Sequence, residues 1–219
     1  MRRRPLPRKF YAGEPVAVAR ALLGCVIQRE LDGELLTARI VETEAYLGAN
    51  DSSSHARGGL RSERNSSMYL PGGHAYVYFT YGMHFCMNVV TGDHDIAEAV
   101  LLRAAQPLEG IERMRLNRPR AKREIDLMSG PGKLCQALAI DRGLDGADLS
   151  SRELSITPHR SPIADEDIAV SPRIGVENSG EAAWWPLRFF LRGNPFVSMP
   201  RSWRDAPAIE SEKPSRRKR

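Results

Sequence analysis

Short runs of β-branched and aromatic residues, joined by turn residues and not by helices, place the strongest constraint on the fold of this chain. The turn dipeptide Asp32-Gly33 predicts one hairpin, and two β-rich runs joined around Tyr81-Gly82 predict a second with a tyrosine at its tip. Strands and helices do not alternate regularly, so we expect an α+β protein: a single mixed α/β domain with a curved, mainly antiparallel sheet and a protruding β-hairpin. Strands are predicted over 25–28, 35–44, 75–80, 83–90, 98–104, 154–157, 173–176 and 187–192.

Helices are predicted where apolar residues recur at helical spacing between start and stop signals. One opens at Pro15, where proline suits the first helical turn, and ends at Gly24. A second helix is expected over 107–116. A third is expected over 131–140, with Ser129 as the residue that caps its start.

One folded domain is expected over 9–205, because 219 residues with 42% hydrophobic content suffice for a single core. A flexible basic arm, 1–8, and a flexible basic tail, 206–219, are predicted to flank it. The basic residues are concentrated near both ends, so that the part of the chain between them is net acidic although the whole chain carries +5. The total charge is therefore weak support for a nucleic-acid partner.

Several classes of protein are disfavoured by composition. The chain has no apolar run long enough to cross a membrane and no apolar signal core after its basic start, so we expect a cytoplasmic protein without membrane contact. Its cysteines are few and widely spaced, so no disulfides are expected. Its histidines lack metal-ligand spacing, and we expect no metal and no cofactor. The basic stretch 113–123 fits either a solvated surface or a phosphate contact.

Two groups of side chains could carry chemistry. Glu42, Glu44 and Tyr46 alternate along one predicted strand and therefore point to one face of it. Carboxylates on the core side would be costly unless they are paired or used, and the alternative is an exposed edge face. Tyr78 and Tyr81, with a neighbouring tyrosine, offer flat faces for stacking a base or for insertion between base pairs, whereas packing in the core is the alternative.

Two further segments are open to more than one interpretation. The run from Ser129 to Lys133 presents free backbone N–H groups at a helix start beside a lysine, which suits a phosphate. An ordinary helix cap fits this run as well. The polar, glycine-rich segment 48–73, which contains His55, is long enough to be functional or disordered.

Six sequence runs together carry a family resemblance that none of them carries alone. They are RIVETEAYLGANDSSSHARGG (39–59), YVYFTYGMHFCMNV (76–89), LLRAAQPLEG (101–110), SGPGKLCQALAI (129–140), RIGV (173–176) and PLRFFLRGNPFVS (186–198). In this order and spacing they resemble the alkyladenine (3-methyladenine) DNA glycosylase family. The similarity extends over about residues 10–200 and is partial between Gly59 and Met68.

The resemblance implies an enzyme that flips a damaged purine out of duplex DNA and hydrolyses its N-glycosidic bond. Glu44 matches the catalytic glutamate of the family, and Arg103 matches the arginine that helps to hold the attacking water. Tyr46 and Tyr78, together with His55, resemble the walls of the pocket that sandwiches the flipped base.

The resemblance also implies residues that contact DNA around the lesion. Tyr81 matches the residue that enters the duplex in place of the flipped base, and Met83 resembles its neighbour at the tip. Asn88 resembles the pocket residue that disfavours the 2-amino group of guanine. Gly132, through its backbone, and Lys133 resemble phosphate contacts.

The expected partner is duplex DNA with alkylated or deaminated purines, bound by a monomer near the nucleoid of a bacterial cytoplasm. Aromatic walls would attract cationic lesions such as 3-methyladenine and 7-methylguanine. Neutral hypoxanthine and ethenoadenine also need a proton, for which His55 is one candidate donor. No lysine lies at a matched catalytic position, so the expected product is an intact abasic site. A non-catalytic damage sensor and a single-strand RNA-binding domain are the competing hypotheses.

Overall fold

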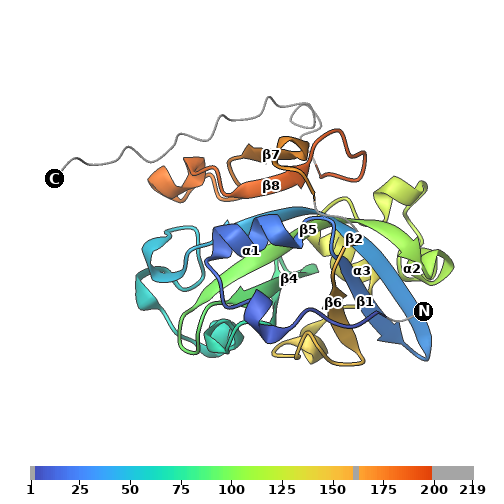
Figure 1. Cartoon of the computed structure of the whole chain (residues 1–219), viewed down its shortest axis with the longest axis horizontal. Coiled ribbons are helices and arrows are strands. Elements are labelled where there is room, and N and C mark those ends of the chain that lie inside the picture. Colours follow the sequence, from blue (N-terminus) through green and yellow to red (C-terminus); the bar gives the residue numbers. More distant parts are fainter. Residues whose placement is uncertain (1–2, 160–162, 199–219) are drawn as a thin grey trace.

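The computed structural model describes residues 3–159 and 163–198, which build a curved antiparallel sheet with helices packed against it (Figure 1). Its strands are β1 (Val26–Leu31), β2 (Glu34–Tyr46), β3 (Ala75–Thr80), β4 (His84–Thr91), β5 (Glu98–Glu109), β6 (Leu154–Thr157), β7 (Ile168–Ser171) and β8 (Arg188–Leu191). The strand order is β3-β4-β5-β2-β1-β6, while β8 pairs with β2 and β7. The predicted α+β domain with a curved, mainly antiparallel sheet is confirmed.

The long strands β2 and β5 form the centre of the sheet. β2 pairs with β5 along one edge, and its other edge is shared between β1, over residues 34–39, and β8, over residues 42–44. The β2–β5 register shifts on both sides of Glu42, which indicates a local irregularity of the ladder there. Glu42 and Glu44 of β2 therefore lie where three strands meet and where almost no water reaches.

The β3–β4 hairpin forms as the sequence predicts. Tyr81 and Gly82 at its turn have φ values of 51° and 65°, the two positive values of a tight hairpin turn whose twist matches the strands. The polar segment before β3 is ordered, with 3-10 helices at Gly48–Asn50, Arg57–Gly59 and Glu63–Tyr69. The last of these 3-10 helices contacts β3 and β4, so the segment lies beside the hairpin.

Three α-helices in the described ranges pack against the sheet. α1 (Pro15–Leu22) begins with proline, as predicted, and contacts β2 and β5. α2 is Ile111–Asn117, and the predicted helix start at 107 is wrong because residues 107–109 still belong to β5. α3 (Pro131–Ala137) packs on β4 and β5 and is shorter than predicted.

The predicted serine cap of α3 is wrong. Gly130, at a φ of 152°, precedes this helix, and no side chain caps its first turn. The Ser129 hydroxyl instead accepts a hydrogen bond from Lys133 Nζ at 3.4 Å. The first backbone N–H groups of α3 therefore donate to no capping side chain.

The predicted strand over 173–176 does not form, and the strand β7 lies a few residues earlier, at Ile168–Ser171. The backbone of 173–176 is used differently, because the Ile174 N–H donates to a carboxylate and not to a neighbouring strand. The Arg173 side chain turns inward to form a buried ion pair. Local β propensity is overridden here by polar contacts across the fold.

The N-terminal residues that the structure describes are attached to the domain. The Leu6 N–H donates to Ile156 O at 2.7 Å, its side chain is buried, and Arg8 pairs with Asp148. Part of the segment 1–8 thus packs against the folded unit, whereas the predicted tail 206–219 lies outside the described residues. No helix in the described ranges is long and apolar enough to cross a membrane.

Candidate active site

A cavity of about 390 Å³ opens between the β3–β4 hairpin, the segment 48–73 and the segment 173–176. Aromatic rings and a few polar groups line it, which is typical of a pocket for a flat, partly polar ligand. The predicted base-pocket residues Tyr46, His55, Tyr78 and Asn88 all lie in its wall, as does Arg103. The fold therefore brings together side chains that are far apart in the sequence.

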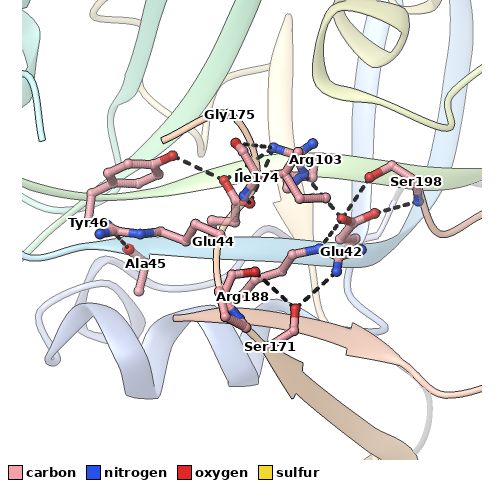
Figure 2. Close-up of polar contacts among 12 residues, drawn as sticks. Glu42, Glu44, Ala45, Tyr46, Arg103, Ser171, Ile174, Gly175, Arg188 and Ser198 are labelled. Carbon is pink, nitrogen blue, oxygen red and sulfur yellow. Dashed lines mark hydrogen bonds and ion pairs between the residues drawn. The ribbon is translucent and has the colours of Figure 1, made fainter. Parts of the chain in front are cut away.

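Glu44 lies directly behind this wall and is completely buried. Its carboxylate accepts hydrogen bonds from the Tyr46 hydroxyl at 3.0 Å, Arg103 Nη1 at 3.2 Å and the Ile174 backbone N–H at 2.8 Å (Figure 2). All three donors line the cavity. A carboxylate has about four lone-pair positions, so three donors leave room for one further donor.

Arg103 lies between two buried carboxylates (Figure 2). Its Nε donates to Glu42 at 3.1 Å while its Nη1 donates to Glu44. Burial disfavours the charged guanidinium, but the Glu44 and Glu42 carboxylates outweigh this effect and raise the pKa of Arg103 above its ordinary value. Arg103 is therefore a permanent cation beside Glu44.

Glu42 is the second buried carboxylate and has more donors than Glu44. Besides Arg103, it accepts from Arg188 Nε at 2.6 Å and from the Ser198 N–H and hydroxyl at 2.6 and 2.8 Å. The far side of Arg188 donates to the Ser171 hydroxyl at 3.0 Å. Two carboxylates and two guanidinium groups thus balance one another within a region from which water is excluded.

The tyrosines form one side of the cavity together with His55. The His55 and Tyr78 rings meet edge to face with centroids 4.5 Å apart. His55 Nδ1 forms a hydrogen bond with the Tyr76 hydroxyl at 2.8 Å. Burial first, and then the positive charges of Arg64 and Arg57, lower the pKa of His55 to about 4. The imidazole is therefore neutral at pH 7.

Tyr46 forms another part of the wall and keeps its proton. Burial, and after it the nearby Glu44 charge, raise the pKa of the Tyr46 hydroxyl well above its ordinary value, so this group donates to Glu44 throughout the neutral range. Asn88 is also buried, and its Nδ2 donates to the Tyr76 carbonyl at 3.1 Å. This bond fixes the orientation of the Asn88 amide in the cavity wall.

The hairpin tip projects an aromatic and a thioether side chain into solvent. Tyr81 is 80% exposed and Met83 is 70% exposed, although most large apolar side chains of the domain are buried. Tyr81 also lines the cavity. The tip is therefore an apolar projection at the entrance to an aromatic pocket.

Gly132 and Lys133 lie near the tip but outside the cavity. A Cβ atom on Gly132 would lie 2.9 Å from the Cβ of His84, so only glycine permits this contact between α3 and β4. Pro131 of the same turn lines the cavity. The predicted phosphate-binding residues are thus adjacent to the base pocket and to the hairpin tip.

Sequence reasoning missed several groups that hold the site together. These are the Ile174 N–H, Arg188, Ser198 and the buried Arg173–Asp51 ion pair. Their only sequence signal is their place inside the RIVETEAYLGANDSSSHARGG, RIGV and PLRFFLRGNPFVS runs. In the described ranges, no three histidine, cysteine, aspartate or glutamate side chains gather as metal ligands would, and the three cysteines are free and buried.

The chain is similar to known proteins over most of its length. Residues 9–195 match the family model for methylpurine-DNA glycosylase. A relative from Carboxydothermus hydrogenoformans, provisionally named 3-methyladenine DNA glycosylase, is 50% identical over 193 residues, which are 88% of this chain and 98% of the relative. The DNA-3-methyladenine glycosylase of Homo sapiens is 45% identical over 203 residues, which are 87% of this chain and 67% of the human protein.

Proposed function

The chain belongs to the methylpurine-DNA glycosylase family, and we propose on this premise that it is a monofunctional DNA glycosylase that starts base excision repair. Its substrates would be purines damaged by alkylation or deamination: 3-methyladenine, 7-methylguanine, hypoxanthine and ethenoadenine. One observation supports this most strongly. A buried carboxylate, Glu44, lies behind an aromatic cavity whose entrance carries the exposed aromatic residue Tyr81.

The proposed reaction begins with extrusion of the base. A base inside a duplex cannot reach the cavity, so the nucleotide must rotate out of the stack, which costs unstacking energy. Tyr81 at the rigid hairpin tip would fill the vacated position, with Met83 beside it. The flipped purine would then lie between Tyr46 and Tyr78, against His55.

Hydrolysis would take place at the wall that Glu44, Tyr46 and Arg103 share. As the base departs, positive charge develops on the sugar, and the Glu44 carboxylate would stabilise it. A water in the remaining acceptor position of Glu44 would lose its proton to the carboxylate and attack C1′. Arg103 would keep the carboxylate and water in place.

His55 is better suited to hold a base than to protonate it. With a pKa of about 4, only roughly one His55 ring in a thousand is protonated at pH 7. We therefore propose that His55 acts as a wall and a hydrogen-bond partner. Asn88, oriented by the Tyr76 carbonyl, would disfavour purines with a 2-amino group.

We propose that the enzyme works as a monomer at the nucleoid and leaves an abasic site. No lysine is among the described residues that line the cavity. An amine nucleophile is needed for a Schiff base, so simple hydrolysis fits these groups better than a lyase reaction.

The test is base release from a duplex oligonucleotide with a single hypoxanthine or 7-methylguanine, in the presence of a metal chelator. Release of the free base, with strand breakage only after alkali, would support the proposal. Tight binding of the lesion duplex without release would favour a damage sensor. Preference for single-stranded RNA over any duplex would favour an RNA-binding domain.

Replacing Tyr81 with alanine is expected to weaken binding of lesion duplex and to slow base release about tenfold or more, since stacked aromatic side chains are worth about 1–3 kcal/mol per base. The measurement is single-turnover excision with saturating and subsaturating enzyme. Tyr81→Phe, which keeps the ring, is the matched control and should behave as the wild type. Equal activity of both variants would contradict the insertion role.

Replacing Lys133 with alanine is expected to weaken binding to damaged and undamaged duplexes alike, because a phosphate contact carries no base information. The slope of log K against log salt should decrease by about 0.9, the value for one phosphate. Lys9→Ala, a charge removed from an exposed site near the N-terminus, is the control. A variant that loses only lesion discrimination would show that Lys133 does not contact phosphate.

A further inference from the structure

An arginine guanidinium lies against each of the two tyrosine walls of the cavity. Arg173 Cζ is 4.6 Å from the ring centroid of Tyr46, and Arg64 Cζ is 5.9 Å from the ring centroid of Tyr78. Neither arginine is among the residues that line the cavity. Each guanidinium therefore contacts its ring from outside the cavity.

The two arginines differ in how their charge is compensated. Arg173 forms a completely buried ion pair with Asp51, in which Nη2 donates to Oδ1 at 2.9 Å. The two charges of this pair cancel, so the pair has little electrostatic effect on a ligand in the cavity. Arg64 forms no ion pair within the described part of the chain, and its Nη2 donates to the Phe79 carbonyl at 3.3 Å. Arg64 is thus an exposed cation without a carboxylate partner in these ranges, beside the Tyr78 wall of the cavity.

The pKa of His55 reflects the Arg64 charge at the cavity wall. Its ring lies 4.5 Å from the ring of Tyr78, and it faces Tyr76 as its hydrogen-bond partner. Burial lowers the pKa of His55 most, and Arg64 and then Arg57 lower it further. The same positive potential that disfavours a proton on His55 acts on any ligand beside it.

We propose that Arg64 is a specificity-determining residue, which disfavours cationic bases in this cavity and so favours uncharged damaged purines over cationic ones. The inference rests on the proposed base-excision function. A tyrosine face attracts a cation, but the Arg64 guanidinium beside Tyr78 already interacts with that ring and repels a second positive charge. Hypoxanthine would gain from this arrangement relative to 7-methylguanine.

Coulomb's law gives the expected size of the effect. A base stacked on Tyr78 would lie about 9 Å from the guanidinium, and effective dielectric constants from about 80 to about 20 correspond to roughly two- to twentyfold discrimination. The effect is large enough to measure in a ratio of rates. It is small enough that cationic lesions would still be processed.

The experiment compares kcat/KM for duplexes that carry either 7-methylguanine or hypoxanthine in the same sequence. In Arg64→Gln, the ratio of the 7-methylguanine value to the hypoxanthine value should rise two- to twentyfold over wild type. Arg64→Lys keeps the charge and should retain the wild-type ratio. Arg61→Gln is the matched control, because Arg61 lies 4.4 Å from Tyr69, a ring that does not line the cavity, and pairs with Asp95.

A second readout does not depend on turnover. The pKa of His55, followed by NMR of its ring, should rise in Arg64→Gln and stay near the wild-type value in Arg61→Gln. An unchanged ratio with both rates reduced equally would assign Arg64 to a phosphate contact and overturn the proposal, as would an unchanged His55 pKa. If the wild type released neither base, the proposed function would fail instead, and the NMR titration would still test the charge effect.

Discussion

Replacing Glu44 with glutamine is expected to lower the single-turnover rate of base release by about 10²–10⁴-fold, the usual contribution of general acid–base catalysis. Glutamine has nearly the same volume and can still accept from Arg103 or from Ile174. It cannot deprotonate water, and it does not carry the negative charge that stabilises a positively charged sugar. The loss should therefore appear in the chemical step.

The measurement is excision of hypoxanthine with enzyme in excess, alongside the affinity for a duplex with an abasic-site analogue. Glu63→Gln, at an exposed site near the cavity, is the matched control and should match wild type in both assays. A Glu44→Gln variant that bound the analogue normally and released base at the wild-type rate would remove Glu44 from the mechanism. A large loss of analogue binding would show that the substitution disturbs the site as a whole.

Replacing Glu42 with glutamine is expected to lower the free energy of unfolding by about 3–5 kcal/mol, the cost of removing one partner from a buried ion pair. The carboxylate of Glu42 accepts from Arg103, Arg188 and both donors of Ser198. Without the Glu42 charge, Glu44 would be the one carboxylate left beside the buried guanidinium groups of Arg103 and Arg188 among the side chains of this cluster. Urea unfolding followed by circular dichroism measures the change.

Ser171→Ala is the matched control for this prediction. It removes one neutral hydrogen-bond acceptor from Arg188 in the same buried group and should cost less, about 1.5–3 kcal/mol. Comparable losses in the two variants would show that the Glu42 charge is not what stabilises the group. Base release should also slow in Glu42→Gln, because the charged group that holds Arg103 Nε would become a neutral amide and hold it less firmly.

Local sequence patterns predicted the elements whose formation depends on neighbouring residues. The turn of the β3–β4 hairpin follows from two β-rich runs joined at a glycine that accepts positive φ, and α1 begins at the proline that favours a first turn. Alternation along β2 places Glu42 and Glu44 on one face, and both indeed contact Arg103. These features need no knowledge of distant residues.

Local patterns failed where backbone groups serve contacts across the fold. Residues 173–176 have the composition of a strand, yet Ile174 N–H bonds to Glu44, which is 130 positions away. The start of α2 was misplaced because β5 continues to Glu109 in order to pair with β2. In both cases a tertiary partner competes with local propensity and prevails.

The sequence by itself determined the hairpins and the antiparallel sheet, and the family resemblance predicted a set of base-pocket residues that the fold brings into the wall of one cavity. Only the tertiary structure decided how the buried charges are paired: Glu42 with Arg188 and Arg103, and Arg173 with Asp51. A charged side chain can be buried only next to an opposite charge, and that partner is selected by how strands distant in the sequence pack. Short-range periodicity holds no information about such a choice.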